Sequence, residues 1–438
     1  MLLTASYYFY FSAKAEYLII LLVSTAVNYL SGVTIARHQE RKKIVLSLSL
    51  VFNLGVLFFF KYFNFVGSQL NTLFDSFSLP LSIPHHSLIL PIGISFYTFM
   101  AIGYVLDVYW GDIKCHKNYL TFSLYMSFFP QILCGPIGRA KNLFVQFTTD
   151  HPLQYDNFAN GFRLILWGLF KKMVVADNIA VYVDAVFNNT PMHSSLTVIV
   201  ATLLFPIQLY ADFSGYTDIA RGVAKLLGYN LMVNFRTPYV NSTSVTDYWK
   251  RNHISLTSWF RDYVFYPFLG TSTSKYKLYL GIFIMFLASG IWHGASWMFV
   301  IWGIIQAVYL IIDDLTGIAK HRSSNIIVNV LKRTSTFVLL SFGLVFFRLA
   351  SVGDIMFFYR AITKCDWALF IGTRSNILNI LSGILILFAC ELVIDKKQID
   401  EYIMCKRYYL RWSLYIGLII LMFLCGNWGG GGFLYYKF

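Results

Sequence analysis

The sequence is poor in charged residues. Asp, Glu, Lys and Arg make up only 13% of its 438 residues, whereas hydrophobic residues make up 57% and aromatic residues 18%. A soluble globular protein carries about 25% charged residues, so this composition excludes an ordinary soluble protein. Polar blocks long enough to fold as a separate soluble domain are also absent, and we therefore expect one membrane-embedded domain over residues 1–438.

Cysteine is scarce and scattered. The six cysteines, at positions 115, 134, 365, 390, 405 and 425, form no C-x-x-C pair, and most lie in or beside apolar segments. This pattern predicts small membrane hydrophobes rather than a disulfide framework. No histidine pair has H-x-x-x-H spacing, and no carboxylate stands at ligand spacing beside His253 or His293, so we expect no metal site.

The net charge of +14 is explained by topology rather than by nucleic acid. Basic residues cluster at the ends of apolar runs, the pattern of cytoplasmic loops in membrane proteins. ARHQERKK (36–43) and DKKQIDEYIMCKRYYLR (395–411) are therefore expected in the cytoplasm. The last helix then exits on the other side, so the tail NWGGGGFLYYKF (427–438) is expected outside the cytoplasm, as a disordered end or as a docking strand for a partner.

Apolar runs long enough to cross a hydrocarbon core of roughly 30 Å recur along the whole chain. We expect an all-α polytopic membrane protein with ten or eleven embedded segments, at 17–35, 44–63, 91–110, 119–136, 160–180, 194–214, 276–294, 297–313, 334–349, 376–394 and 409–425. PQILCGPIGRAKNLFVQF (130–147) places prolines and glycines inside an apolar run. Broken backbone at membrane depth needs cover from protein or access to water, so a re-entrant loop or cavity wall is predicted there.

The stretch SVTDYWKRNHISLTSWFRDYVFYPFLG (244–270) predicts a helix that does not span. Its aromatic side chains and one histidine recur in steps of four, three, four and three, which indicates one helical face: Trp249, His253, Leu256, Phe260 and Tyr263. Polar residues occupy another face: Lys250, Thr257 and Arg261. A helix of this kind lies at the membrane interface or plugs a cavity.

Two histidines stand out among the nine. His293 lies in the apolar run SGIWHGASWMFVIWG (289–303), where a polar side chain is costly and indicates function. His253 lies on the aromatic face of its predicted helix, so both are expected to point inward. Either they pack helices by bonding to neighbouring carbonyls, or they meet in a dry cavity where a neutral imidazole acts as general base on a hydroxyl. The residues alone leave both alternatives open.

Several segments, in order, resemble the membrane-bound O-acyltransferase family. GIWHGASWMFVIWG (290–303) resembles its signature helix, and YNLMVNFRTPYVNSTSVTDYWKRNHISLTSWFRDYVFYPFLG (229–270) resembles the region before it. PIGISFYTFMAIGYVLDVYWGD (91–112), FFPQILCGPIGR (128–139) and QLYADFSGYTDIARG (208–222) are also similar to family segments. The pattern is most similar to the bacterial branch typified by the membrane subunit of alginate O-acetylation.

The resemblance implies a ring of tilted helices around a central funnel from the cytoplasm, with a core at about 50–313 and C-terminal helices at 334–425. It maps the family's two histidines onto His293, as general base, and His253, which would orient a substrate or support an oxyanion. YWKRNHISL has Asn252 where the family pattern has tryptophan. Family members carry a further apolar segment before the part resembling LLTASYYFY, which implies either one N-terminal span fewer in this sequence or a differently placed start site.

The resemblance also implies the reaction. Acetyl-CoA, or another acyl-CoA, would be the cytoplasmic donor substrate, with no tightly bound cofactor. The acetyl group would cross the bacterial inner (cytoplasmic) membrane and O-acetylate an extracytoplasmic polysaccharide, through a periplasmic or secreted partner acetyltransferase. Membrane lipid is the other expected partner, and nucleic acid is not expected.

Further residues are weaker candidates for substrate binding. The polar residues in ADFSGYTDIA either cap a helix end or line the reaction path: Asp212, Ser214, Tyr216 and Asp218. Two tryptophans adjoin the histidine motifs, Trp249 and Trp292. Four cations either form a funnel mouth for an anionic donor or anchor the chain at the membrane edge: Lys171, Lys172, Arg251 and Arg261.

Three rival functions remain at this point. The first keeps the family and transfers D-alanine from a carrier protein to teichoic acid. The second is a flippase or transporter of a lipid-linked glycan, which predicts substrate movement without acyl chemistry and tolerance of changes at His293. The third is a structural scaffold of an export complex, which needs the aromatic tail but neither histidine.

Overall fold

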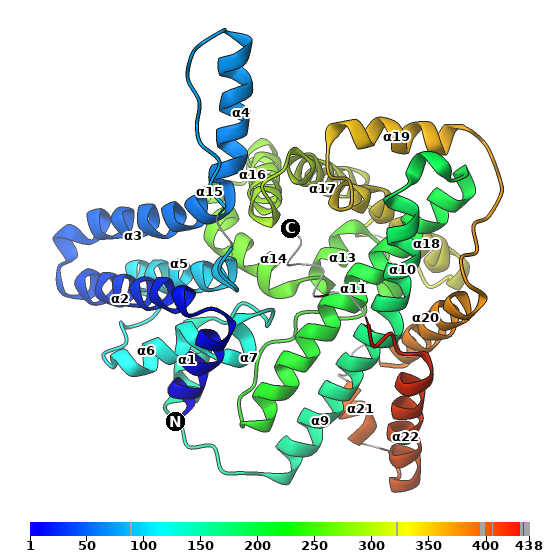
Figure 1. Cartoon of the computed structure of the whole chain (residues 1–438). Coiled ribbons are helices and arrows are strands. Elements are labelled where there is room, and N and C mark those ends of the chain that lie inside the picture. Colours follow the sequence, from blue (N-terminus) through cyan, green and yellow to red (C-terminus); the bar gives the residue numbers. More distant parts are fainter. Residues whose placement is uncertain (88–89, 321–322, 395–398, 405, 430–431, 433–438) are drawn as a thin grey trace. The chain divides into compact units, whose positions relative to one another are not determined.

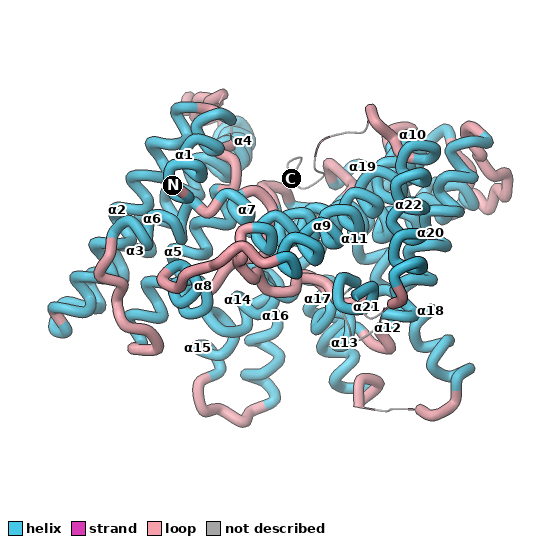
Figure 2. The backbone as a smooth tube through the Cα atoms, turned by 90° about the horizontal axis from the view of Figure 1, so that it is seen from below, coloured by secondary structure: helices cyan, strands magenta, loops and turns pink. Residues whose placement is uncertain are grey.

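All regular structure in the described residues is helical. The computed structural model describes residues 1–438 except 88–89, 321–322, 395–398, 405, 430–431 and 433–438, and no strand occurs among the described residues (Figure 2). Eight of the described helical runs are long and apolar enough to cross a membrane: Ala15–Arg37, Gln39–Ser76, Ser195–Leu226, Lys275–His293, Trp297–Thr316, Ile326–Phe347, Arg374–Ile394 and Tyr408–Cys425. The predicted all-α, multi-pass membrane protein is confirmed.

The chain gathers into two compact units, Met1–Pro152 and Leu153–Phe438. The single membrane domain and the ring of helices around a funnel stay predictions. The first unit contains, in order, α1 (Leu2–Ala13), α2 (Ala15–Arg37), η1 (Gln39–Arg41), α3 (Lys42–Leu57), η2 (Phe58–Tyr62), α4 (Phe63–Ser76), α5 (Ile94–Trp110), α6 (Tyr119–Ser127), α7 (Phe129–Ile132) and α8 (Ala140–Phe147).

Helix α5 forms the buried centre of the first unit and packs on α2 and α3. Those two helices are joined by a buried amide pair, in which Asn53 donates to the side-chain oxygen of Asn28 at 2.7 Å and Asn28 donates back at 3.0 Å. A hydrogen bond inside an apolar helix bundle leaves no unsatisfied polar group and fixes which faces meet. The pair therefore sets the register of α2 against α3.

The proline- and glycine-rich stretch 130–147 is broken, as predicted, and most of its residues up to 138 are buried. Gly138 lies outside the helices, and its carbonyl accepts a hydrogen bond from the Tyr125 hydroxyl at 3.1 Å. The predicted embedded segment 119–136 is not one helix, because α6 ends at Ser127 and Pro130 lies in the short α7. A nine-residue helix is only about 14 Å long, so α6 is too short to cross a membrane.

The second unit carries both histidines of interest. Its elements, in order, are α9 (Tyr155–Leu169), η3 (Phe170–Ala176), α10 (Asp177–Phe187), η4 (Thr190–Met192), α11 (Ser195–Leu226), α12 (Pro238–Asn241), α13 (Val245–Arg251), α14 (Ile254–Phe260), η5 (Arg261–Phe265), α15 (Tyr266–Leu269), α16 (Lys275–His293), α17 (Trp297–Thr316), α18 (Ile326–Leu344), η6 (Val345–Phe347), α19 (Val352–Thr363), α20 (Arg374–Ile394), α21 (Ile399–Met404) and α22 (Tyr408–Cys425).

The 32-residue helix α11 is the spine of the second unit. It lies beside the helical run α9–η3–α10 along its length (Figure 1). Close approach is possible because glycines face each other: a Cβ on Gly168 would lie 2.5 Å from the carbonyl oxygen of Gly215. Small residues at such crossings let backbones of membrane helices approach closely. This crossing brings the π-helical turn η3 against the polar middle of α11.

Candidate active site

The turn between α16 and α17 fixes the position of His293. α16 ends at His293, and Ser296 caps α17 by accepting a hydrogen bond from the backbone N–H of Met298 at 3.2 Å. Between them, a Cβ on Gly294 would lie 2.1 Å from the ring of Phe299, so glycine alone fits there. The sequence Trp-His-Gly-Ala therefore builds a tight hairpin with His293 at a helix end.

His293 is buried in an aromatic cage, with 5% of its surface exposed. Its ring lies 5.1 Å from that of Trp302, edge to face, and 4.9 Å from that of Phe347. Trp302 comes from α17 and Phe347 from η6, so three separate elements hold the imidazole. The prediction of an inward, buried histidine is confirmed.

The helix predicted over 244–270 is broken at His253, so the prediction of one continuous helical face was wrong. α13 ends at Arg251, α14 begins at Ile254, and His253 between them has a left-handed φ of 47°. The backbone N–H of Ile254 donates to the Asn234 carbonyl at 2.9 Å, and that of Ser255 donates to the Asn234 side chain at 3.0 Å. Both N–H groups are therefore unavailable for the backbone hydrogen bonds that would continue α13.

The same asparagine fixes the tautomer of His253. Asn234 Oδ1 accepts hydrogen bonds from the backbone N–H and the hydroxyl of Ser255, which identifies this atom as the oxygen. His253 Nδ1 lies 3.3 Å from the same oxygen and must therefore donate to it. The proton then sits on Nδ1, and Nε2 carries a lone pair.

Burial keeps His253 neutral. The side chain is 4% exposed, and Phe213 packs edge to face on the imidazole at 4.7 Å between ring centres. Removal from water disfavours the charged form and lowers the pKa of His253 from 6.5 to about 3. Its Nε2 has no hydrogen-bond partner within the described part of the chain. His253 therefore presents an unprotonated acceptor at neutral pH.

Both histidines line one cavity in the second unit. The cavity encloses about 470 Å³, open solvent at its mouth included, and its wall is mostly aromatic. The lining residues are Leu209, Tyr210, Phe213, Phe235, Tyr239, Tyr248, Trp249, Asn252, His253, His293, Trp302, Leu344 and Phe347. Asn252 thus lines the cavity at the position where the sequence departs from the family pattern. The structure brings the two predicted histidines together, while their chemical roles stay predictions.

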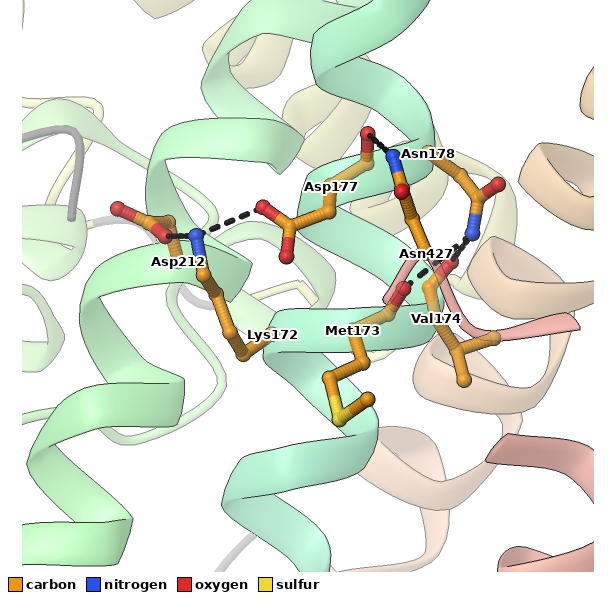
Figure 3. A network of polar contacts seen from close by, with 7 residues as sticks. All are labelled: Lys172, Met173, Val174, Asp177, Asn178, Asp212 and Asn427. Atoms are coloured by element: carbon orange, nitrogen blue, oxygen red, sulfur yellow. Dashed lines mark hydrogen bonds and ion pairs between the residues drawn. The ribbon is translucent and has the colours of Figure 1, made fainter. Parts of the chain in front are cut away.

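The predicted polar residues of α11 lie in the middle of the helix, so the alternative that they cap a helix end was wrong. Lys172 lies 2.7 Å from the carboxylates of both Asp177 and Asp212 (Figure 3). Lys171 lies 2.6 Å from Asp218. It also donates to the Ser214 hydroxyl at 2.9 Å. The two lysines are buried in ion pairs rather than exposed at a cationic mouth.

Asparagines hold the π turn that carries these lysines. Asn178 donates to the Val174 carbonyl at 2.9 Å (Figure 3). It also donates to the Cys425 carbonyl at 2.8 Å, and the backbone N–H of Asn427 donates to the Met173 carbonyl at 3.0 Å. A π turn leaves carbonyls outside the regular helical pattern, and these bonds satisfy them. The end of α22 is thereby tied to η3. Most of the predicted aromatic tail, at 430–431 and 433–438, lies outside the described residues.

The remaining predicted site residues divide into two groups. Trp249 lines the cavity. Trp292 is buried, and its ring centre lies 6.4 Å from that of His253. The Tyr216 ring lies farther along α11, where the Lys172 ammonium approaches it at 5.5 Å. The tryptophans therefore lie beside the histidines, and Tyr216 belongs with the lysine–aspartate network.

The two predicted arginines are not part of the cavity wall. Arg251 pairs with Asp247 at 3.0 Å, and Arg261 pairs with Asp262 at 2.9 Å. Within the described ranges, no three His, Cys, Asp or Glu side chains lie together as metal ligands. The roles of the arginines in donor binding and the absence of a metal stay predictions.

Sequence reasoning missed a buried acid on α20. Tyr210 lines the cavity, and its hydroxyl donates to the carboxylate of Glu391, which is 3% exposed. A single carboxylate within the apolar run 376–394 is the signal that was available, because charged residues in membrane helices are costly and indicate function. Asn234 gave no such signal, since only the folded chain shows what it binds.

The family model of the membrane-bound O-acyltransferases matches residues 115–348, a range that includes both histidines of the cavity. The chain belongs to this family. It is therefore an acyltransferase, and the flippase and scaffold interpretations lose their basis. The resemblance of the sequence motifs to this family is confirmed.

Three relatives indicate the type of reaction. The chain is 36% identical to the probable alginate O-acetylase of Pseudomonas aeruginosa, over 88% of this chain and 74% of that protein. It is 32% identical to the peptidoglycan O-acetyltransferase of Helicobacter pylori, over 79% of this chain and 70% of that protein. It is 29% identical to the teichoic acid D-alanyltransferase of Bacillus subtilis, over 60% of this chain and 70% of that protein. All three names describe transfer of an acyl group to a polymer, and O-acylation of a polymer is the activity shared with this chain.

Proposed function

We propose that this membrane-bound O-acyltransferase moves an acetyl group from cytoplasmic acetyl-CoA to the outside of the bacterial inner membrane, for O-acetylation of an extracytoplasmic polysaccharide. Two relatives named as O-acetylating enzymes match the chain at 36% and 32% identity, whereas the D-alanyltransferase matches at 29% over a shorter stretch. The higher sequence identity thus favours an acetyl group over D-alanine as the group that is transferred.

The observation that carries the proposal is the pair of buried histidines on one aromatic cavity. His253 offers an unprotonated Nε2, and His293 lies at the C-terminal end of α16. The partial negative charge at a helix C-terminus stabilises positive charge nearby. This setting suits His293 to carry a proton for a short time.

These positions support the following reaction. The acceptor hydroxyl oxygen attacks the thioester carbonyl carbon while His293 takes the hydroxyl proton. The C–S bond then breaks, and the leaving thiolate takes the proton from His293, so that an ester and a free thiol result. General base catalysis of this kind contributes roughly 10²–10⁴ in rate. The aromatic wall excludes water, which protects the thioester from hydrolysis.

His253 has a narrower role than the sequence left open. Its Nδ1 proton is committed to Asn234, so Nε2 accepts a hydrogen bond and cannot donate one to an oxyanion. With a pKa of about 3, it is also too weak a base to remove the hydroxyl proton. His253 therefore orients the substrate by accepting a hydrogen bond from a donor other than the reacting hydroxyl, whose single proton goes to His293.

A partner is expected to complete the transfer outside the membrane. The sequence contains no G-x-S-x-G nucleophile elbow and no block long enough for a soluble domain. The family resemblance implies a periplasmic or secreted acetyltransferase with a serine-hydrolase-like fold. Its hydroxyl, or that of the glycan, is the acceptor in the cavity.

The test is His293→Ala in the full chain, reconstituted in liposomes with [¹⁴C]acetyl-CoA on the cytoplasmic side. We expect transfer to an acceptor alcohol to fall by about 10²–10⁴, with normal insertion and expression. His253→Ala lowers transfer as well, because the substrate loses its orientation. Undiminished transfer by His293→Ala contradicts the base assignment.

The D-alanyl alternative is distinguished chemically. Cells expressing the chain together with its neighbouring genes are treated with mild alkali, which cleaves esters on the surface polymer. Released acetate supports the proposal, whereas released D-alanine supports transfer to teichoic acid.

A further inference from the structure

Among the residues that the structure describes, two indole N–H groups from the histidine cavity have no hydrogen-bond partner. Trp249 and Trp302 both line the cavity, and within the described residues neither Nε1 atom is bonded, although both atoms are buried. Buried donors in native proteins are almost always paired. Two unpaired donors on residues that line one cavity therefore call for a specific explanation.

Aromatic packing fixes both indoles. The two rings are 5.9 Å apart between centres, at an angle of 72°. Trp302 lies edge to face on His293 at 5.1 Å, and Trp249 lies against Phe286 at 5.0 Å. Trp302 belongs to α17, one turn beyond the hairpin that places His293, and Trp249 belongs to α13, just before the break that places His253. Each donor is thus attached to the same local structure as one histidine.

Two other polar groups on the wall have their protons committed elsewhere. His253 Nδ1 already donates to Asn234, and the Tyr210 hydroxyl donates to Glu391. Acyl transfer places a full negative charge on the carbonyl oxygen when the hydroxyl attacks. Fixed N–H donors around that oxygen stabilise the transition state more than the ground state.

We propose that Trp249 and Trp302 form the oxyanion site of this enzyme, with their Nε1–H groups donating to the carbonyl oxygen of the acyl donor. This inference rests on the proposed function for its thioester donor but holds for any acyl group. The C–O bond forms, the carbonyl electron pair moves onto the oxygen held by the two indoles, and His293 takes the hydroxyl proton. When the carbonyl re-forms, the C–S bond breaks and the leaving thiolate takes the proton from His293.

The experiment replaces each indole N–H by sulfur with little change of shape. β-(3-Benzothienyl)alanine is introduced by nonsense suppression at position 249, at position 302 and at both, in the full chain in liposomes. We expect kcat with acetyl-CoA to fall by about 10²–10³ at each position, with KM unchanged within about twofold. A loss confined to kcat marks an interaction made in the transition state. The kcat of Trp249→Phe and that of Trp302→Phe should each fall at least as far.

Trp167 provides the matched control. It is 5% exposed in the same unit and stacks on Phe170, but it does not line the histidine cavity. The same replacement there leaves kcat unchanged. Wild-type kcat in the benzothienyl variants at 249 and 302, or a change in KM alone, overturns the oxyanion site. If the unsubstituted protein uses a D-alanyl thioester but not acetyl-CoA, acetyl-CoA is not the donor. The test of the two indoles is then repeated with the D-alanyl thioester, and its outcome still decides the oxyanion site.

Discussion

At the scale of single residues, the chemistry depends on which atoms of His253 and His293 are available. His293 is caged by Trp302 and Phe347 at a helix end, and His253, which lines the same cavity, is held by Asn234 through Nδ1. The sequence predicted that both side chains point inward, His253 from the helical period and His293 from its apolar surroundings. It did not predict the tautomer, because the partner of Nδ1 lies 19 residues earlier in the chain.

The neutral state of His253 has a measurable consequence for stability. Its pKa is about 3 in the folded protein, against 6.5 for an ordinary histidine. Between these values the unfolded chain binds a proton that the folded chain does not, so this histidine destabilises the fold as pH falls from about 6.5 toward 3. Above pH 6.5 it has no such effect.

We therefore expect His253→Gln, which keeps an acceptor oxygen, to lose less thermal stability than wild type on acidification. The measurement is the unfolding midpoint in detergent micelles at pH 7, 5.5 and 4.5. The two proteins should converge as pH falls. Parallel curves for the two proteins would show that His253 is protonated in the folded state. His253→Gln should also retain more transfer activity than His253→Ala.

At the scale of elements, close helix crossings decide where the polar groups meet. α11 carries Asp212 and Asp218, η3 carries Lys171 and Lys172, and the ion pairs between them form only when the backbones approach. The sequence showed the two sets of charges but not their pairing. Pairing across helices depends on a crossing that has no local signature except small residues.

The crossing itself is testable at Gly215. A Cβ there would lie 2.8 Å from the Gly168 carbonyl oxygen and 3.3 Å from the Lys172 nitrogen. Gly215→Ala should therefore push α9–η3 from α11 and destabilise the protein by about 1–3 kcal/mol, seen as a lower unfolding midpoint.

Gly417→Ala is the matched control, since nothing lies within 4 Å of a Cβ at that position of α22. In a helix, alanine is favoured over glycine by about 0.5–1 kcal/mol, so the control is neutral or slightly stabilising. Equal midpoints for the two variants would contradict the close crossing.

At the scale of the whole molecule, orientation in the membrane follows from charge. The basic stretches 36–43 and 395–411 are predicted in the cytoplasm, although residues 395–398 and 405 lie outside the described part of the structure. Helix α20 then runs outward from its C-terminal end, which places Cys365 and the loop before α20 on the other side. Cys365 is exposed and provides a natural reporter.

We expect a membrane-impermeant maleimide to label Cys365 in right-side-out vesicles when the other cysteines are replaced. A single cysteine introduced by Glu40→Cys, in a chain that lacks all six natural ones, should be labelled in inside-out vesicles only. The reverse pattern would show that the funnel predicted for the donor opens on the wrong side for acetyl-CoA.

The sequence by itself determined the class and family of this protein. A low charge content and repeated apolar runs require a lipid environment, and the ordered motifs, Trp-His-Gly-Ala among them, carry the resemblance to the family. Only the tertiary structure decided the break at His253, the tautomer of its ring, the bond from Tyr210 to Glu391 and the two unpaired indoles. These features depend on which distant group takes each hydrogen bond, and a hydrophobic period carries no information about that choice.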